Sequence, residues 1–409
     1  MADFARKAKS QEWLDFFDVL LGSLISLLRR IHSIHQVIME AIETTNESNK
    51  SDSIVIPEKQ LEEIKSTSKE VLINVCDQVA DRSSKYLTQR SKQNSAKLIT
   101  TTELCKMGNL VELFGHESTR MTGKVSSGLV LSLQGQNILY IQAYHESKHQ
   151  LLNKLLEREK WKISSLNFEQ ILSHVADLPV LADAFGVPAE NCNGVNNNNS
   201  KSVIVVEGQS FVVPDVGHEF TMMLADYCHL CALLPSISVE LGLKTAEMVK
   251  FYNSKICQLI IGAGAISVSG LKTITVRNLA LAQRTIQLVT QIIPHVLKHF
   301  ESCHLSKNHE SVSEAKQFET FRKQFEQTLM HLKNHSHELE VKILMIIESL
   351  ITPQLTSWQP SNQIPSKNFK DLCRQLTKFH ESIEDIWTSE AKSKVMTKVQ
   401  KFRLTNKTF

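Results

Sequence analysis

Turn-forming and aromatic residues are scarce in this sequence of 409 residues. It contains 14 glycines and 9 prolines, and aromatic residues make up 6% of the chain. β-Sandwiches and β-barrels need turn residues roughly every 8 to 12 positions, so this composition suits helices better than either of those folds. At this length the chain could hold two or three compact domains or one extended helical array.

A strong net charge is also missing. The chain has 46 Lys and Arg residues against 43 Asp and Glu residues, a formal net charge of +3. Nucleic-acid-binding domains carry a strongly basic face, so nucleic acid is not an expected partner. The 8 cysteines are spread along the chain without the density of a disulfide framework. We interpret them as reduced thiols of a cytosolic protein.

Long apolar runs are absent near the amino terminus. The first apolar region begins late and is interrupted by acidic residues between positions 12 and 18, which is not typical of a signal peptide. The apolar series that starts at Val19 meets Arg29 and Arg30 before it reaches the roughly 20 residues that a membrane helix needs. The sequence therefore predicts neither a signal peptide nor a membrane span in this region.

Helical periodicity is abundant. Along 11–42, apolar residues recur in alternating steps of three and four, which places one stripe on a helix. Additional leucines widen the stripe, and a wide stripe needs more than one neighbour, so a helix inside a bundle is favoured over an isolated two-stranded coil. The stripe consists of Phe17, Leu20, Leu24, Leu27, Ile31, Ile34 and Ile38. Further helices are expected at 57–93, 103–115, 119–161, 217–234, 235–261, 275–303, a helix ending at Pro353, and the pair 367–386 and 390–402.

One convincing β signal interrupts this pattern. The apolar segments 203–206 and 211–213 flank Glu207-Gly208-Gln209 and follow a loop rich in Pro, Gly and Asn. A lone hairpin is marginal in water, so it must lie on a helical layer. The sequence thus predicts an all-α protein, an elongated rod of stacked helical bundles with one small β-hairpin. Four parts are expected: an amino-terminal helical segment at 1–178, the loop and hairpin at 179–216, a central bundle at 217–352 and a helix pair at 353–409.

The segment 251–296 is rich in small and apolar residues, and no Asp or Glu occurs between Glu247 and Glu301. Leu259-Ile260-Ile261 followed by Gly262-Ala263-Gly264 resembles the strand and turn that open a dinucleotide-binding unit. The spacing argues against it, because Ser267 stands where the third Gly is needed and no acid follows to bind the ribose. We favour a helix end at which small residues let another backbone approach, followed by a turn and a new helix.

Four basic residues of this region are the sharpest candidates for a contact site. One interpretation makes them a basic patch for acidic partner helices or an anionic membrane surface. The other makes them the solvated face of a buried helix pair, which is the more common role of a charge run and the one we favour. The residues are Lys250, Lys255, Lys272 and Arg277.

Patterns for metal binding or catalysis are weak. Cys228 and Cys231 have the spacing of half a zinc knuckle, but no second pair follows and the surroundings are apolar. His295 with His299 and His331 with His335 are four residues apart, yet the Glu that a zinc protease needs after the first His is missing. No nucleophile elbow, phosphate loop or carboxylate pair is found. We therefore predict no catalytic residue, no metal site and no cofactor.

Five motifs concentrate in the region from 227 to 294. They are Phe251-Tyr252-Asn253-Ser254-Lys255, Cys257-Gln258-Leu259, Gly262-Ala263-Gly264-Ala265, Gly270-Leu271-Lys272-Thr273-Ile274-Thr275 and Asn278-Leu279-Ala280-Leu281-Ala282. With these motifs the chain resembles the vacuolar protein sorting-associated protein 54 family, whose members are the distinguishing subunit of the Golgi-associated retrograde protein (GARP) tethering complex. Weaker similarity occurs at 159–162, 203–213 and 378–381.

The resemblance implies a non-enzymatic tethering subunit that captures endosome-derived vesicles at the trans-Golgi network. Its implied partners are other GARP subunits and SNARE proteins of the syntaxin type, with peripheral contact to Golgi or endosomal membranes. Only the carboxy-terminal half of the family is covered, and the residues after 387 depart from its pattern. The alternatives are a subunit of another helical-rod tether, of the exocyst or oligomeric Golgi type, and a nicotinamide-dependent oxidoreductase using Gly262 and Gly264.

Overall fold

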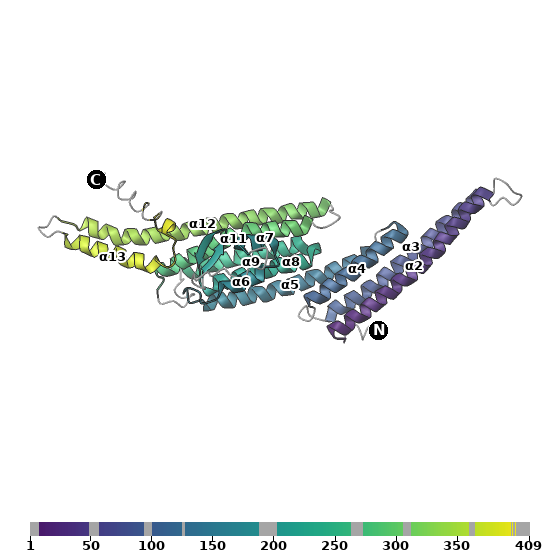
Figure 1. Cartoon of the computed structure of the whole chain (residues 1–409), viewed down its shortest axis with the longest axis horizontal. Helices are drawn as coiled ribbons and strands as arrows, with labels where there is room; N and C mark the ends of the chain where they lie inside the picture. Colours follow the sequence, from purple (N-terminus) through teal and green to yellow (C-terminus); the bar gives the residue numbers. More distant parts are fainter. Residues whose placement is uncertain are drawn as a thin grey trace. The chain divides into compact units, whose positions relative to one another are not determined.

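Helices account for nearly all regular structure in the computed structural model (Figure 1). The structure describes residues 8–48, 57–93, 100–124, 127–187, 203–262, 273–305, 312–359, 365–393, 395 and 397. The predicted all-α class with one β-hairpin is confirmed, while the elongated rod stays a prediction. The elements are α2 (Ser10–Ser48), α3 (Glu58–Gln93), α4 (Thr101–Thr122), α5 (Ser127–Arg158), α6 (Phe168–Val175), α7 (Pro179–Phe185), β1 (Val203–Val206), β2 (Gln209–Val212), α8 (Asp215–Leu233), the 3₁₀ helix η1 (Pro235–Ile237), α9 (Ser238–Ile260), α11 (Val276–Leu305), α12 (Val312–Thr356) and α13 (Lys367–Ile383).

Packing divides the chain into two units, Met1–His145 and Glu146–Phe409, so the division lies within α5. The predicted four-part organisation stays a prediction beside this division. Helix α12 runs through the expected boundary at 352/353 to Thr356, although its end was predicted at Pro353. The reason is that a proline this close to a helix end removes only its own N–H bond. The turn after it is still closed by Ser357 N–H, which donates to the Pro353 carbonyl at 3.1 Å.

In unit 1, helix α2 packs against α3 and α4. Trp13, Phe17, Leu21 and Leu28 are buried along α2, and Trp13 and Phe17 stack with ring centroids 4.9 Å apart. Their spacing of four and seven residues follows one face of a helix. The buried line thus lies to one side of the predicted stripe, of which Leu27 and Ile34 are exposed.

A buried ion pair joins α3 to α4 in the same unit. Arg90 Nε lies 3.3 Å from Glu103 Oε1, and both side chains are almost fully buried. Arg90 also donates from Nη1 to the Ala8 carbonyl oxygen and lies over the Trp13 ring, with Cζ 5.5 Å from its centroid. These contacts stabilise the buried charges of Arg90 and Glu103, which water does not reach.

A single helix over 119–161 was predicted, and this is wrong. Helix α4 ends at Thr122, and Gly123 caps it with φ of 71°, its N–H donating to the Thr119 carbonyl at 2.8 Å. Glycine adopts this left-handed conformation without the strain of a Cβ, and so ends the helix. The expected helix at 103–115 is the interior of α4, which Thr100 caps by accepting from Glu103 N–H.

Unit 2 is built around α11, which contacts α7, α8, α9, α12, α13 and the hairpin. Helices α8, α9 and α11 bury residues on most of their faces, the pattern of helices inside a core. Phe220 of α8 stacks on Tyr252 of α9, with ring centroids 3.8 Å apart. Between α11 and α12, Phe300 and Phe325 flank Phe321.

The hairpin pairs β1 and β2 antiparallel, with Val203 opposite Val212 and Val206 opposite Gln209. Its two turn residues both have positive φ, 48° at Glu207 and 74° at Gly208, as in the turns that match the twist of a hairpin. The strands contact α11, and β1 also contacts α7. The prediction that the hairpin lies on a helical layer is therefore confirmed.

No single helix in the described ranges is long and apolar enough to cross a membrane. Helices α8 and η1–α9 meet that test only as a pair, and they bend by 114° at the break between them. The expected last helix, 390–402, lies largely outside the described residues.

Candidate interaction surfaces

The residues that a dinucleotide-binding unit would need as a strand form the end of a helix. Leu259 and Ile260 are the buried last residues of α9, and Ile261 follows in right-handed helical conformation. Gly262 N–H donates to the Cys257 carbonyl at 2.9 Å, which closes the helix end. The favoured helix end is confirmed, and the strand that an oxidoreductase would need is contradicted at these residues. Gly264 and the rest of 263–272 lie outside the described residues.

The four predicted basic residues are placed differently from one another. Lys250 and Lys255 lie half-buried on α9, and neither forms an ion pair within the described residues. Lys272 is outside those residues. Arg277, in the first turn of α11, donates to both carboxylate oxygens of Asp385 at 2.8 and 2.6 Å.

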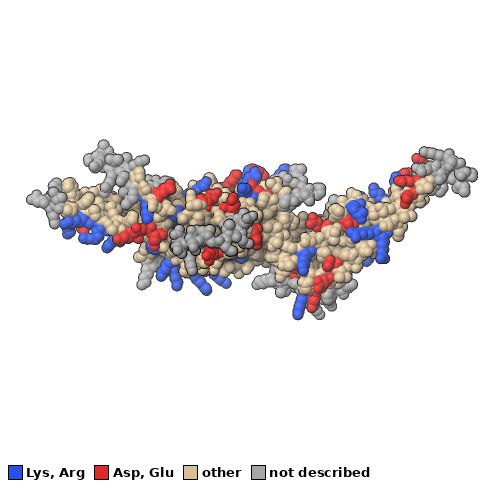
Figure 2. Space-filling model, viewed as in Figure 1, with Lys and Arg blue, Asp and Glu red and all other residues tan. Residues whose placement is uncertain are grey.

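This fork-to-carboxylate pair ties α11 to the segment after α13. Arg277 Nη1 also donates to the Ser382 carbonyl oxygen at 3.1 Å. The hydrogen bond from Arg277 lowers the pKa of the Asp385 carboxyl below its ordinary value, and the same bond raises the pKa of Arg277. Arg277 thus has an internal partner, and a partner-contact role for the four residues stays a prediction. On the face drawn in Figure 2, cationic and anionic side chains are interspersed.

Cys228 and Cys231 of α8 lie beside α11. His299 Nε2 donates toward the Cys228 carbonyl oxygen, 2.9 Å away, and is 3.5 Å from Cys303 Sγ. Hydrogen bonding with Cys231, and next with His299, lowers the pKa of the Cys303 thiol to about 5. Burial raises the pKa of Cys228. In the part of the chain that is described, no group of three His, Cys, Asp or Glu residues is arranged to hold a metal ion.

The paired histidines have separate partners. His295 lies 3.0 Å from Glu207, whereas His299 faces α8. His335 Nδ1 is 2.6 Å from the Asn253 side-chain oxygen. These contacts account for His295, His299 and His335 as packing and surface groups.

An apolar groove on α2 and α3 was not predicted. It has a volume of about 510 Å³ and is lined by Ile31, Ile34, Ile38, Ile64, Val71 and Leu72, together with polar residues such as His35 and Ser68. Ile34 is 62% exposed and Val71 51% exposed, which is unusual for branched apolar side chains on paired helices. Ser68 Oγ and His35 Nδ1 are 2.7 Å apart and join the two helices at this point. The apolar stripe on 11–42 was the available signal, because α3 covers its second half only in part and leaves Ile34 exposed.

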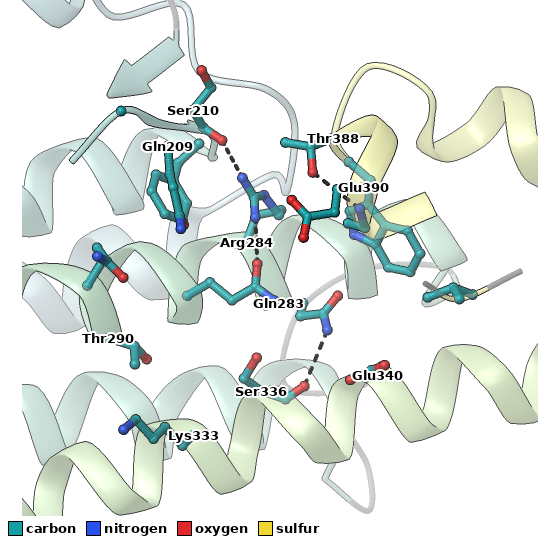
Figure 3. Close-up of a pocket in the computed structure, with 17 residues that line it drawn as sticks. Gln209, Ser210, Gln283, Arg284, Thr290, Lys333, Ser336, Glu340, Thr388 and Glu390 are labelled. Carbon is teal, nitrogen blue, oxygen red and sulfur yellow. Dashed lines mark hydrogen bonds between the residues drawn. The ribbon is translucent and has the colours of Figure 1, made fainter. Parts of the chain in front are cut away.

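A polar pocket of about 610 Å³ lies in unit 2 (Figure 3). It is bounded by the hairpin, α11, α12 and residues 387–395. Arg284 of α11 is its buried cation, and Lys333 of α12 also lines it. Sequence reasoning missed Arg284, since nothing local distinguishes it from an exposed arginine.

Comparison with known proteins finds a family match in the segment that contains α8, α9 and α11. A family model described as Vps54-like protein matches residues 208–350. Vacuolar protein sorting-associated protein 54 of Homo sapiens is 27% identical over 342 residues, which cover 83% of this chain and 34% of that protein. The Drosophila melanogaster protein of the same name is 27% identical over 383 residues, covering 92% of this chain and 38% of that protein.

A more distant relative is vacuolar protein sorting-associated protein 54, chloroplastic, of Arabidopsis thaliana. It is 26% identical over 258 residues, covering 47% of this chain and 25% of that protein. This chain therefore spans about a third of the length of its animal relatives, 34% of the human and 38% of the fly protein. No solved structure matches it significantly.

Proposed function

Residues 208–350 of this chain belong to the Vps54-like protein family, and on that premise we propose that the chain is a vesicle-tethering subunit. It serves retrograde transport from endosomes to the trans-Golgi network, as a cytosolic protein held peripherally at those membranes. It acts through contacts with other GARP subunits and with SNARE proteins of the syntaxin type, and makes or breaks no covalent bond. The observation that carries this proposal is the family match in the core of unit 2, supported by similarity to relatives named for vacuolar protein sorting.

The groove on α2 and α3 supports the proposal in unit 1. An amphipathic helix of another subunit could place its apolar face against Ile34, Ile64 and Val71, as in recognition of a helix by an apolar groove. Fully covering such side chains contributes about 1.5 to 3 kcal/mol each, and half of that remains available where a side chain is half exposed. Assembly with a helical partner is therefore the use that fits this surface best.

Co-purification of the tagged chain from cells tests the proposal. We expect other GARP subunits to be recovered, and we expect the triple variant Ile34→Ser, Ile64→Ser, Val71→Ser to lower that recovery about tenfold or more. Val19→Ser is the matched control, because Val19 is an exposed apolar residue of the same helix outside the groove. A second readout is the return of endosomal cargo to the trans-Golgi network in cells depleted of the resident relative.

Two outcomes would count against the proposal. Recovery of exocyst or oligomeric Golgi subunits in place of GARP subunits would assign the chain to a different tether. Recovery of no tether subunit by a chain whose helical content is intact would contradict tethering itself.

A further inference from the structure

Arg284 is a buried cation held by neutral groups. Its side chain lies on α11 and is only 6% exposed. Nη1 donates to Gln287 Oε1 at 2.7 Å, and Nη2 donates to the Ser210 carbonyl oxygen. The guanidinium carbon lies 4.5 Å from the centroid of the Phe211 ring. Within the described residues no carboxylate forms an ion pair with it, and its Nε has no hydrogen-bond partner.

The charge persists despite the burial. Loss of solvent lowers the pKa of Arg284 to about 10, which still leaves the group protonated at neutral pH. A desolvated charge is costly unless it is paired, because neutral dipoles and an aromatic face replace only part of its hydration. The site is therefore incomplete, and an anion would stabilise it.

The pocket beside Arg284 has room for that anion. Figure 3 shows Arg284 between Ser210 of the hairpin and the segment that carries Thr388 and Glu390. Part of the lining of the cavity, which has a volume of about 610 Å³, consists of uncharged amides and hydroxyls, among them Gln209, Gln283, Gln287, Thr290, Gln291 and Ser336. Such groups match the hydrogen-bonding groups of a polypeptide backbone.

We infer that this pocket binds a carboxylate side chain of a partner polypeptide, with Arg284 as its ion-pair partner. The planar guanidinium fork fits a planar carboxylate, which can accept from the N–H groups that Gln287 and Ser210 leave unused. Glu340 and Glu390 line the same pocket and balance the charges of Arg284 and Lys333, which favours a singly charged carboxylate over a phosphate of nearly two negative charges. The inference goes beyond the tethering proposal and does not depend on it.

The Arg284 Nε–H signal of the full chain tests the inference. The chain is prepared with ¹⁵N-labelled arginine, and the Arg284 signal is assigned by its loss in Arg284→Lys. Three probes are added separately: N-acetylglutamate N-methylamide, the neutral glutamine counterpart, and inorganic phosphate. We expect a saturable shift with the glutamate probe and no shift with the glutamine probe. Phosphate should bind at least about tenfold more weakly than the glutamate probe.

Variants locate the contact. The glutamate probe can also be followed at the indole N–H of Trp387, which lines the pocket. By the Trp387 signal, Arg284→Lys should bind the glutamate probe about tenfold more weakly, because lysine keeps the charge but loses the planar fork. Lys316→Gln should leave it unchanged, since Lys316 lies 17 residues before the pocket residue Lys333 on α12, roughly 25 Å along the helix.

Several results would overturn the inference. One is the absence of a saturable shift, and another is an equal response to the glutamate and glutamine probes. Tighter binding of phosphate than of the glutamate probe would assign the site to a phosphate group instead. The last is a shift of the Arg284 signal in the variant Glu390→Gln measured without any probe. If that shift is as large as the one the glutamate probe produces in the unmodified chain, the anion that pairs with Arg284 is Glu390 of the chain itself.

Discussion

The two units cover their apolar residues to different extents. In unit 2, Ala280, Leu281 and Ile286 of α11 point in different directions, yet all three are fully buried. In unit 1, α2 buries Phe17 and Leu21 on one face and leaves Ile34 and other apolar residues exposed. Within the described residues, the core of unit 2 around α11 is closed, whereas unit 1 leaves apolar side chains exposed in the α2–α3 groove.

The difference follows from the number of neighbours each helix has. Helix α11 is enclosed by helices and by the hairpin, so apolar residues all round it are covered. Among the described residues, helix α2 packs mainly against α3 and α4. The family-matched segment 208–350 lies in the enclosed unit. We therefore expect core substitutions to unfold unit 2, and substitutions in the α2–α3 groove to act on binding instead.

The largest effect is expected for Phe321→Ala. Phe321 is fully buried, 4.9 Å from Phe325 and 6.0 Å from Phe300 between ring centroids. Removing the ring leaves a cavity and should lower the free energy of unfolding by about 3 to 5 kcal/mol, measured in urea. Phe369→Ala is the control, because this ring is exposed, and it should change stability by about 0.5 kcal/mol or less. Equal effects of the two variants would deny the difference between core and surface.

Unit 1 has its own sensitive point in Glu103. Glu103→Gln removes the carboxylate that faces the buried cation of Arg90, which should lower the free energy of unfolding of unit 1 by about 3 kcal/mol. Glu62→Gln removes an exposed pair with Lys65 and should cost about 0.5 kcal/mol or less. A loss below about 1 kcal/mol for Glu103→Gln would mean that other groups stabilise Arg90.

Substituting alanine for each of two glycines should change the free energy of unfolding in opposite directions. A Cβ at Gly242 of α9 would lie 2.2 Å from Phe321 Cε2, so Gly242→Ala should destabilise unit 2 by about 1 to 3 kcal/mol. Nothing lies within 4 Å of the same position at Gly108 of α4. Gly108→Ala should therefore stabilise unit 1 by about 0.5 to 1 kcal/mol. Thermal unfolding of the two variants measures both signs, and a stabilising Gly242→Ala would contradict the packing of α9 on α12.

The smallest expected effect on stability comes from an electrostatic interaction of Glu117 on the surface of unit 1. Hydrogen bonds from Arg29 and then Arg120 lower the pKa of the Glu117 carboxyl to about 2. Because the folded pKa is below the unfolded one, the stabilising contribution is present above about pH 4.3 and is lost as the pH falls toward 2. NMR titration of Glu117 should show its pKa rising in Arg29→Gln. An unchanged pKa would mean that Arg29 does not hold this carboxylate in solution.

Local patterns in the sequence were enough for much of the fold. Apolar periodicity located α2, α3, α8, α9 and α11, and the turn residues Glu207 and Gly208 located the hairpin. The break at Gly123 was missed because a glycine inside an apolar pattern either weakens a helix or ends it, and only the backbone conformation decides between the two.

The candidate sites depended on contacts between distant residues. The pairing of Arg277 with Asp385 joins positions 108 residues apart, and Arg284 meets Ser210 across 74 residues. The groove on α2 and α3 depends on which neighbours are absent from one face within the unit. Spacing along the chain contains none of this information.

Amide hydrogen exchange tests the contrast between the two units most directly, measured on the chain alone and after addition of other GARP subunits. We predict that α9 and α11 are strongly protected in both states, while residues 31–38 and 64–72 gain protection only when the partner subunits are present. Strong protection of the groove residues in the chain alone, with no change on adding the partners, would contradict an open docking surface on α2 and α3.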